Sequence, residues 1–346
     1  MIVAIISIVL LGFCVLALLA RPFTRGFNHN SRGEAFGSAR EAGPKLDEYS
    51  LENNKSQNKI AVISIEGVIS GHEFNQAGNN LVDLVAAQLD QARADKRVKA
   101  VILKMDSPGG EVLASDEIYR QIREFQEDSK KPVICSMGSL AASGGYYISS
   151  GCRWIVANEL TLTGSIGVIM HGWNYRGLMD KLGVAPMTYK SGKYKDMLSG
   201  ERATNEIPAG EHDMVQGLIN ETYEKFKGVV AEGRATAHAL NKKEGKALAD
   251  NWEDYADGRV VSGKQALELG LVDELGNFDD AVERAEKLAH IPDSHLVEYR
   301  EHYDISDLFS MFGESSRSHD IKLNLGIEPP KLQAGLLYYL APTFVN

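Results

Sequence analysis

The order of apolar runs along the chain restricts the possible folds more than any other feature of the sequence. Residues 60–69 and 98–105 are short, β-branched apolar runs, and the segment between them carries leucines and valines at helical spacing. An amphipathic stretch at residues 112–125 and a third apolar run at residues 132–137 repeat this order. Alternating strands and helices predict parallel strands joined by crossover helices, and therefore an α/β fold.

The chain continues with shorter elements after this core. We expect a short helix at residues 143–151, a strand at 154–157, a helix at 174–182 that leads to a strand at 185–189, and a long surface helix within residues 207–240. At 346 residues, the chain has room for one large α/β domain with appendages or for two modest domains.

The composition argues against several classes of protein. The net charge is −10 and the basic residues form no cluster that could neutralise phosphates, so we expect no nucleic-acid partner. Three cysteines cannot build a disulfide framework, and we expect Cys135 and Cys152 to be buried thiols. No cluster of histidines, cysteines or carboxylates has metal-ligand spacing and no phosphate loop is present, so we expect no cofactor.

The first twenty residues carry no charged side chain and are almost entirely apolar. As a helix they would span roughly 30 Å, so residues 1–20 are predicted to form one transmembrane helix that anchors the protein in lipid. A cleaved signal peptide is the alternative, but it would need a basic start and a small-x-small cleavage site. Arg21, Arg25 and Arg32 follow this segment, and by the positive-inside rule they place the domain in the cytoplasm.

Residues 21–58 are polar and weakly periodic, so they are interpreted as a linker, either a tether or a loose helix. Ser56 and Lys59 match the S-x-x-K pattern of β-lactamase-like enzymes. In a polar linker, this match is interpreted as chance.

Residues 106–110, Asp-Ser-Pro-Gly-Gly, directly follow the second apolar run. Glycines lack a Cβ atom and let backbone N–H groups approach a substrate closely, which suits an oxyanion hole. The alternative is an ordinary tight turn, because Pro-Gly-Gly is common in loops.

A serine stands in the segment Ala-Ala-Ser-Gly-Gly-Tyr-Tyr at residues 141–147. Ser143 would lie at the first turn of a helix, where unpaired N–H groups and the helix dipole favour a developing negative charge. It could equally be a simple N-cap. Because Ala141 occupies the first position, the segment is not a G-x-S-x-G elbow, and an α/β-hydrolase is excluded.

Two further segments complete a pattern: Thr-Gly-Ser-Ile-Gly-Val at residues 163–168 and Ser-Gly-Lys-Tyr-Lys-Asp at residues 191–196. With the two glycine motifs above, and in this order, they resemble the SppA family of serine/lysine membrane peptidases. Residues 258–276, GRVVSGKQALELGLVDELG, are similar to a downstream signature of that family. The resemblance covers residues 59–290 and implies a ClpP/crotonase-like fold.

The resemblance implies a role for each matching residue. Ser143 would be the nucleophile, Lys195 its general base and Ser165 the hydroxyl that orients the lysine amine. The backbone N–H groups of Gly110 and Gly144 would form the oxyanion hole. A lysine can act as a base where a dry pocket favours its neutral form, and such a pocket suits apolar peptides. The implied substrates are signal peptides left in the membrane.

Other residues could confuse this assignment. Lys193 lies close to Lys195, but the lysine followed directly by Asp196 is the one that matches the family. His171 lies 28 residues after Ser143, as a ClpP-type histidine might be spaced, but serine/lysine peptidases need no histidine. We therefore interpret His171 as a packing or surface residue.

The C-terminal residues 291–346 lie outside the resemblance and are treated as an extension of unknown role. Their apolar run at residues 335–340 could pack on a neighbouring subunit, touch the membrane or lie in a cleft.

Two other functions compete with a peptidase: a crotonase-like acyl-CoA enzyme and an inactive membrane scaffold. The resemblance also implies that the domain lies on the extracytoplasmic side of the membrane, whereas Arg21, Arg25 and Arg32 favour the cytoplasmic side. Longer relatives carry two copies of the fold, with lysine in one and serine in the other. A single-copy chain is therefore expected to form a ring-like homo-oligomer in which neighbouring subunits complete each active site.

Overall fold

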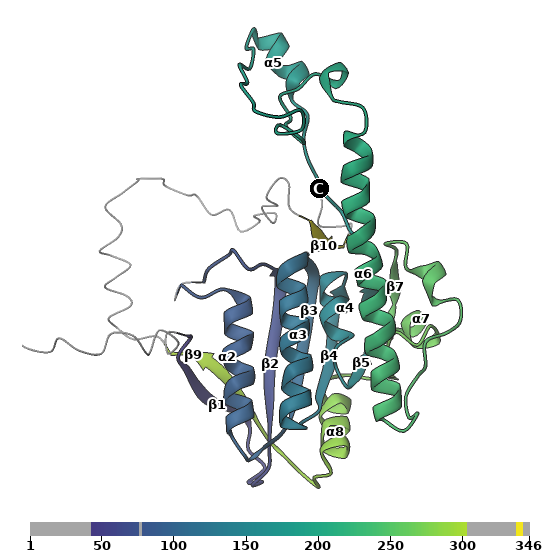
Figure 1. Cartoon of the computed structure of the whole chain (residues 1–346). Helices are drawn as coiled ribbons and strands as arrows, with labels where there is room; N and C mark the ends of the chain where they lie inside the picture. Colours follow the sequence, from purple (N-terminus) through teal and green to yellow (C-terminus); the bar gives the residue numbers. More distant parts are fainter. Residues whose placement is uncertain (1–42, 76–77, 303–336, 342–346) are drawn as a thin grey trace, which may run out of the picture. The chain divides into compact units, whose positions relative to one another are not determined.

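The computed structural model describes residues 43–75, 78–302 and 337–341, which form one mixed sheet (Figure 1). In spatial order its main path is β1 (Leu46–Glu52), β9 (His295–Glu301), β2 (Lys59–Ile69), β3 (Val98–Glu111), β4 (Val133–Ala142), β5 (Trp154–Ala157) and β8 (Glu274–Leu275). Strand β6 (Leu162–Gly164) pairs with β4, β7 (Val260–Ser262) with β6, and β10 (Tyr338–Leu340) with β3. All neighbours from β9 to β8 are parallel, which confirms the predicted parallel core.

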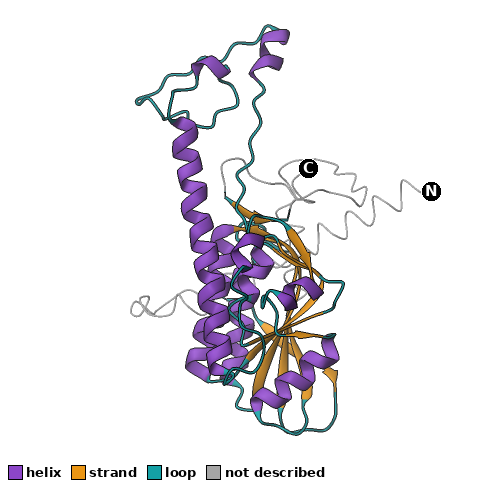
Figure 2. Ribbon diagram, turned by 90° about the vertical axis from the view of Figure 1, so that its right-hand side faces the viewer, coloured by secondary structure: helices purple, strands orange, loops and turns teal. Residues whose placement is uncertain are grey.

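Helices lie on both faces of the sheet (Figure 2). One face is covered by α2 (Leu81–Ala94), α3 (Val112–Ser129), α4 (Gly144–Ser149) and α6 (Glu211–Leu240), and the other by α8 (Phe278–Ala289). The remaining helices of the described residues are α5 (Arg176–Leu182), α7 (Gly263–Glu268) and two short 3-10 turns, η1 (Thr204–Glu206) and η2 (Trp252–Tyr255). The sequence therefore folds as an α/β layered domain, as predicted.

The two hydrophobic cores follow the alternation of side chains along each strand. Ile60 and Val62 of β2 pack with Ala281 and Ala285 of α8, whereas Ile63 points to the other face, into the larger core. Because both faces are buried, the central strands are apolar at nearly every position.

The shorter elements follow the sequence prediction with one exception. The expected helices appear as α4, α5 and α6, and the expected strand at residues 154–157 is β5. The strand predicted at residues 185–189 is wrong: this segment has no regular structure and is mostly exposed. An isolated extended segment gains no ladder hydrogen bonds, and no described strand lies beside it.

The sheet extends past both predicted domain boundaries. Residues 46–52, predicted as part of the linker, form β1, which pairs antiparallel with β9. Strand β9 and strand β10 both belong to the predicted C-terminal extension. Most of β1 is exposed, so it lacks the apolar alternation that would reveal a strand. The predicted membrane helix lies outside the described residues, and no described helix is long and apolar enough to cross a membrane.

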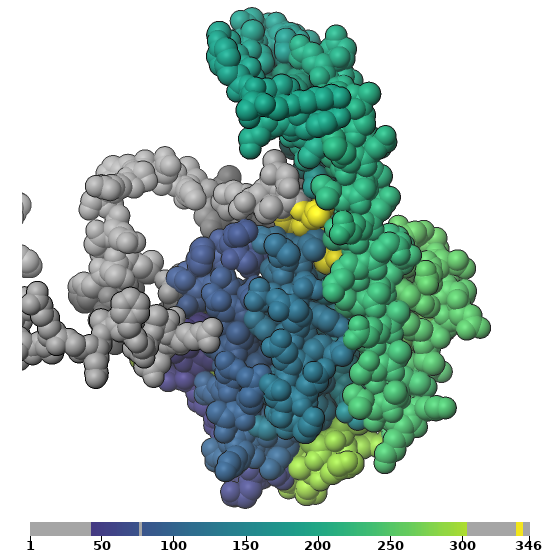
Figure 3. Space-filling model, viewed as in Figure 1, coloured from purple at the N-terminus to yellow at the C-terminus, as the bar shows by residue number. Residues whose placement is uncertain are grey.

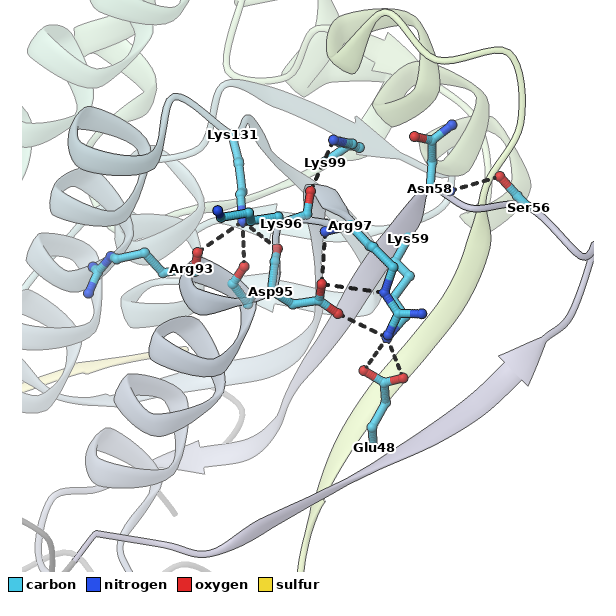
Figure 4. Close-up of polar contacts among 11 residues, drawn as sticks. Glu48, Ser56, Asn58, Lys59, Arg93, Asp95, Lys96, Arg97, Lys99 and Lys131 are labelled. Carbon is cyan, nitrogen blue, oxygen red and sulfur yellow. Dashed lines mark hydrogen bonds and ion pairs between the residues drawn. The ribbon is translucent and has the colours of Figure 1, made fainter.

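A polar cluster joins β1, β2 and the end of α2 (Figure 4). The buried Lys59 ammonium lies 2.5 Å from a Glu48 carboxylate oxygen and 2.9 Å from one of Asp95. Ser56 instead donates to Asp293 at 2.7 Å. The S-x-x-K match therefore makes no serine–lysine pair here, and Lys59 stabilises the sheet edge.

A second ion pair, between Arg234 and Asp273, is fully buried. Arg234 of α6 binds Asp273 with both ends of its guanidinium, at 2.9 and 2.5 Å, and also donates to the Gly270 carbonyl. The same Asp273 carboxylate accepts the amide of Ile155 in β5. Burial alone would lower the pKa of Arg234, but the charge and hydrogen bonds of Asp273 raise it. The pair therefore stays ionised and fixes α6 to the sheet.

We predict that Asp273→Ala lowers the free energy of unfolding by about 3–5 kcal/mol, because it leaves a buried guanidinium without its counter-charge. The measurement is urea denaturation followed by circular dichroism. Asp90→Ala, which removes an exposed partner of Arg93, is the control and should cost less than about 1 kcal/mol. Equal effects of the two substitutions would contradict the assigned role of the buried pair.

Candidate active site

Ser143 lies in a sharp turn between strand β4 and helix α4. Its backbone has φ 55° and ψ −116°, a strained conformation for a residue other than glycine. The turn is fixed because the Ser143 amide donates to the Gly164 carbonyl at 2.8 Å and its carbonyl accepts the Tyr147 amide. Ser143 occupies the N-cap position of α4, but its side chain does not cap the helix. The hydroxyl is buried and has no hydrogen-bond partner within the described residues.

Gly110 and Gly144 lie near each other, and the atoms around them leave no room for a side chain at either position. A Cβ atom on Gly144 would lie 2.6 Å from the Ser115 hydroxyl and 3.1 Å from the Gly110 amide nitrogen. A Cβ atom on Gly110 would lie 1.9 Å from the Ile69 carbonyl oxygen. The structure therefore brings together the two amides that the sequence singled out, next to Ser143.

The segment at residues 106–110 is not the glycine turn that the sequence predicted. It continues β3 as extended chain, with Gly109 and Gly110 paired to Val68 and Ile69 of β2. Gly109 has φ +100°, which only glycine adopts without strain. Pro-Gly-Gly is typical of turns, and only the neighbouring strands make it extended here.

Two side chains that sequence reasoning missed support this region. The Glu111 carboxylate accepts the Ser70 hydroxyl at 2.6 Å and the Gly71 amide at 3.1 Å, which ties the end of β3 to the end of β2. The Ser115 hydroxyl donates to the Glu111 carbonyl at 2.9 Å and lies against Gly144. Neither residue belongs to a recognisable motif, so no local sequence signal identified them.

Ser165 lies next to the residue whose carbonyl binds the Ser143 amide. It follows Gly164, whose carbonyl binds the Ser143 amide, and its own amide donates to the Arg259 carbonyl at 2.8 Å. Ser165 also lines a cavity of about 620 Å³, together with Ile219 and Tyr223 of α6. Ser165 could therefore contact a polar group that enters this cavity.

The structure does not pair Lys195 with Ser143. Lys195 is exposed in the segment between α5 and η1, and Figure 2 shows α6 running past the sheet to this part of the chain. The neighbouring Lys190 binds Asp196 at 2.8 Å. The His171 ring packs edge-on against Trp173, with centroids 5.0 Å apart, and no described hydrogen bond joins it to Ser143.

The stretch of chain that contains Lys195 exposes large apolar side chains. We call residues 171–200 the Lys195 segment. Its exposed apolar side chains include Trp173, Leu178, Leu182, Val184, Met187 and Tyr189, of which Met187 and Tyr189 are 81% and 89% exposed. Clusters of this kind on a soluble surface mark sites of association.

Strand β10 lies beside the predicted oxyanion hole. Strand β10 runs antiparallel to residues 109–111 of β3, and on its other side Tyr338 exchanges two backbone hydrogen bonds with Ile169, at 3.0 and 3.1 Å. Figure 3 shows this yellow segment beside the atoms of α6. Within the apolar run, the described residues are buried as an added strand of the sheet.

Comparison with known proteins defines the class. The profile of Peptidase family S49 matches residues 125–292. A protein of Enterococcus faecium that is named as a signal peptide peptidase SppA is 37% identical over 260 residues, which are 74% of this chain and 71% of that protein. Protease 4 of Haemophilus influenzae is 38% identical over 240 residues, 69% of this chain and 36% of that protein. Serine protease SPPA, chloroplastic, of Arabidopsis thaliana is 33% identical over 277 residues, which are 78% of this chain and 39% of that protein.

These matches and the buried serine turn identify the chain as a serine peptidase. It belongs to peptidase family S49, the family of the SppA and protease 4 enzymes. The acyl-CoA alternative is thereby set aside.

We predict that Gly144→Ala lowers kcat by about 100-fold or more, because the new Cβ atom would push the Gly144 and Gly110 amides apart and weaken the oxyanion hole. Adding Ser115→Gly should restore part of the activity, since it removes the atom 2.6 Å from that Cβ. Peptidase assays on purified protein measure both effects.

Gly228→Ala is the matched control, because nothing lies within 4 Å of a Cβ at that exposed position of α6. It should cleave peptides at the normal rate. Normal activity of Gly144→Ala would mean that the Gly144 amide does not stabilise the transition state.

Proposed function

We propose that this protein is a membrane-anchored serine endopeptidase that uses Ser143 and Lys195 to degrade signal peptides and similar apolar peptides. The observation that carries the proposal is the Ser143 turn. Its backbone is strained, and its buried hydroxyl lies beside the closely packed glycines Gly110 and Gly144. Backbone N–H groups held in this way suit a tetrahedral oxyanion.

In the proposed reaction, the substrate lies as an extended strand beside β3, with its scissile carbonyl toward Gly110 and Gly144. The Ser143 oxygen attacks the carbonyl carbon while a neutral lysine amine takes the hydroxyl proton. The C–N bond then breaks, the lysine returns the proton to the leaving amine, and an acyl-enzyme remains. Water then attacks the acyl-enzyme while the lysine takes its proton, and the carboxylic acid leaves as the proton returns to the Ser143 oxygen.

The general base in this proposal comes from a neighbouring copy of the chain. Three observations support that arrangement: the Ser143 hydroxyl has no partner within the described residues, Lys195 is exposed, and its segment presents apolar side chains to solvent. The cavity beside Ser165 leaves room for a lysine side chain, which the Ser165 hydroxyl would orient. In a closed ring every subunit gives one lysine and receives one.

The membrane anchor and the substrate class rest on the sequence. Residues 1–20 are long and apolar enough to span a bilayer and would hold the enzyme beside peptides left in the membrane. The family likeness favours the extracytoplasmic side for the domain, although Arg21, Arg25 and Arg32 favour the opposite orientation.

We predict that Ser143→Ala and Lys195→Ala each lower cleavage of a synthetic signal peptide by about 1,000-fold or more. When the two variants are coexpressed, activity should return, because roughly a quarter of the interfaces in a randomly mixed ring join an intact serine to an intact lysine. The measurement is peptidase activity of the purified, detergent-solubilised mixed assembly.

His171→Ala and Lys193→Ala are the controls and should retain most of the activity. A mixed assembly as inactive as its parents would contradict the shared site and place both residues within one chain. Loss of activity in His171→Ala, with activity kept in Lys195→Ala, would instead indicate a ClpP-like histidine base.

A further inference from the structure

Asp196 directly follows Lys195, and its charge opposes the proposed chemistry of that lysine. A lysine takes a proton from a serine only while its amine is neutral, whereas a carboxylate within about 4–6 Å favours the charged ammonium. Residues 193–198 form a turn, in which adjacent side chains can come this close. The sequence therefore places an acid where it would hinder the proposed base.

The structure binds the Asp196 carboxylate to two other cations. The Lys190 ammonium lies 2.8 Å from each of the two Asp196 oxygens, and a guanidinium nitrogen of Arg202 lies 3.6 Å from one of them. These contacts leave the Asp196 side chain only 12% exposed, although Lys195 beside it is exposed. The hydrogen bond from Lys190 is the main cause that lowers the pKa of Asp196, so the acid is ionised at neutral pH.

Arg202 is fixed in turn by Glu211, in the first turn of α6. The two side chains lie 2.5 Å apart and both residues are buried. The same Glu211 oxygen also accepts the Leu198 amide at 3.1 Å, two residues after Asp196. Arg202 therefore has a carboxylate on each side, and the turn that contains Asp196 is joined to the start of α6.

The lysines close to Asp196 differ in their surroundings. Lys195 is exposed and forms no ion pair or side-chain hydrogen bond within the described residues. The Lys193 ammonium lies over the Tyr194 ring, 4.9 Å from its centroid. Of these three lysines, only Lys190 binds the acid.

We propose that Lys190 binds the Asp196 carboxylate in order to leave Lys195, the proposed base, without a counter-ion. Arg202 assists from the other side of the same carboxylate. The inference rests on the proposed role of Lys195 and adds the contact that keeps its amine available as a base. Lys190 touches no substrate in the proposed reaction and is a positioning residue that acts only through Asp196.

The charges that face Asp196 come from its own segment and from α6. Lys190 and Arg202 attract it, whereas Glu211 repels it from beyond Arg202. Without the Lys190 charge, Asp196 would keep one cation at 3.6 Å, which Glu211 already binds more closely. Because Lys195 is adjacent in the chain, the released carboxylate would then stabilise its ammonium.

The test measures kcat/KM against pH for the full-length, detergent-solubilised enzyme. Its substrate is a synthetic signal peptide with capped ends and no ionisable side chain. The parent enzyme should show an ascending limb as the base loses its proton. In Lys190→Met this limb should move to higher pH by about one unit, so kcat/KM falls about tenfold on the limb and little on the plateau. Both values come from one preparation, so a partly unfolded sample does not change their ratio.

Lys193→Met is the matched control. It removes the same charge from the same segment but leaves the Asp196 contacts intact, so its limb should not move. Lys190→Arg keeps the ion pair and should give the profile of the parent enzyme. An unmoved limb in Lys190→Met, an equal shift in Lys193→Met, or a parent profile without an ascending limb would overturn the inference.

The double variant Lys190→Met, Asp196→Asn decides whether Lys190 acts through the acid. With no carboxylate to release, its limb should return to the position of the parent enzyme. A limb that stays displaced would mean that Lys190 acts in another way. Activity lowered equally at every pH would mean that these contacts only hold the fold, and either result would overturn the inference.

The two proposals fail in different ways. If Lys195→Ala cleaves the peptide as well as the parent enzyme, the proposed base is wrong and the inference falls with it. If cleavage requires Lys195 but the limb of Lys190→Met does not move, only the inference is wrong.

Discussion

The candidate active site depends on backbone packing that leaves no room for a side chain. A Cβ on Gly110 at the end of β3 would lie 1.9 Å from the Ile69 carbonyl oxygen, and one on Gly144 at the start of α4 would lie 2.6 Å from the Ser115 hydroxyl. This packing is possible because β3 continues as extended chain where its composition is typical of a turn. With Ser143 held at positive φ beside the two glycines, the proposed oxyanion hole would require little reorganisation during reaction.

The edges of the sheet give the site its second property, the capacity to hold a strand. Strand β10 binds β3 on one side and Ile169 on the other through backbone hydrogen bonds, while the Tyr339 side chain packs against Tyr147 and Phe226. Recognition by strand addition obtains affinity from the main chain and specificity from pockets for single side chains.

The predictability of each part follows from how it is buried. Strands β2, β3 and β4 were recognisable because parallel strands covered on both faces are apolar throughout, and the glycine motifs marked Gly110, Ser143 and Gly144. The edge strand β1 is mostly exposed and lacks this pattern. The apolar run that contains β10 was visible in the sequence, but its pairing with β3 was not, because the two segments lie far apart along the chain. The predicted strand at residues 185–189 failed for the converse reason, since an apolar run without a pairing partner does not form a strand.

The proposed sharing of one active site by two subunits rests on two observations: the buried Ser143 hydroxyl has no hydrogen-bond partner within the described residues, and Lys195 is exposed in a segment with exposed apolar side chains. The most direct test is cross-linking of the double variant Ser143→Cys, Lys195→Cys with a short bismaleimide whose length replaces the lost lysine stem. The parent protein, with only its natural cysteines, is the control. Our account predicts a ladder of covalent oligomers on a denaturing gel. Monomers carrying an internal cross-link between positions 143 and 195 would contradict it.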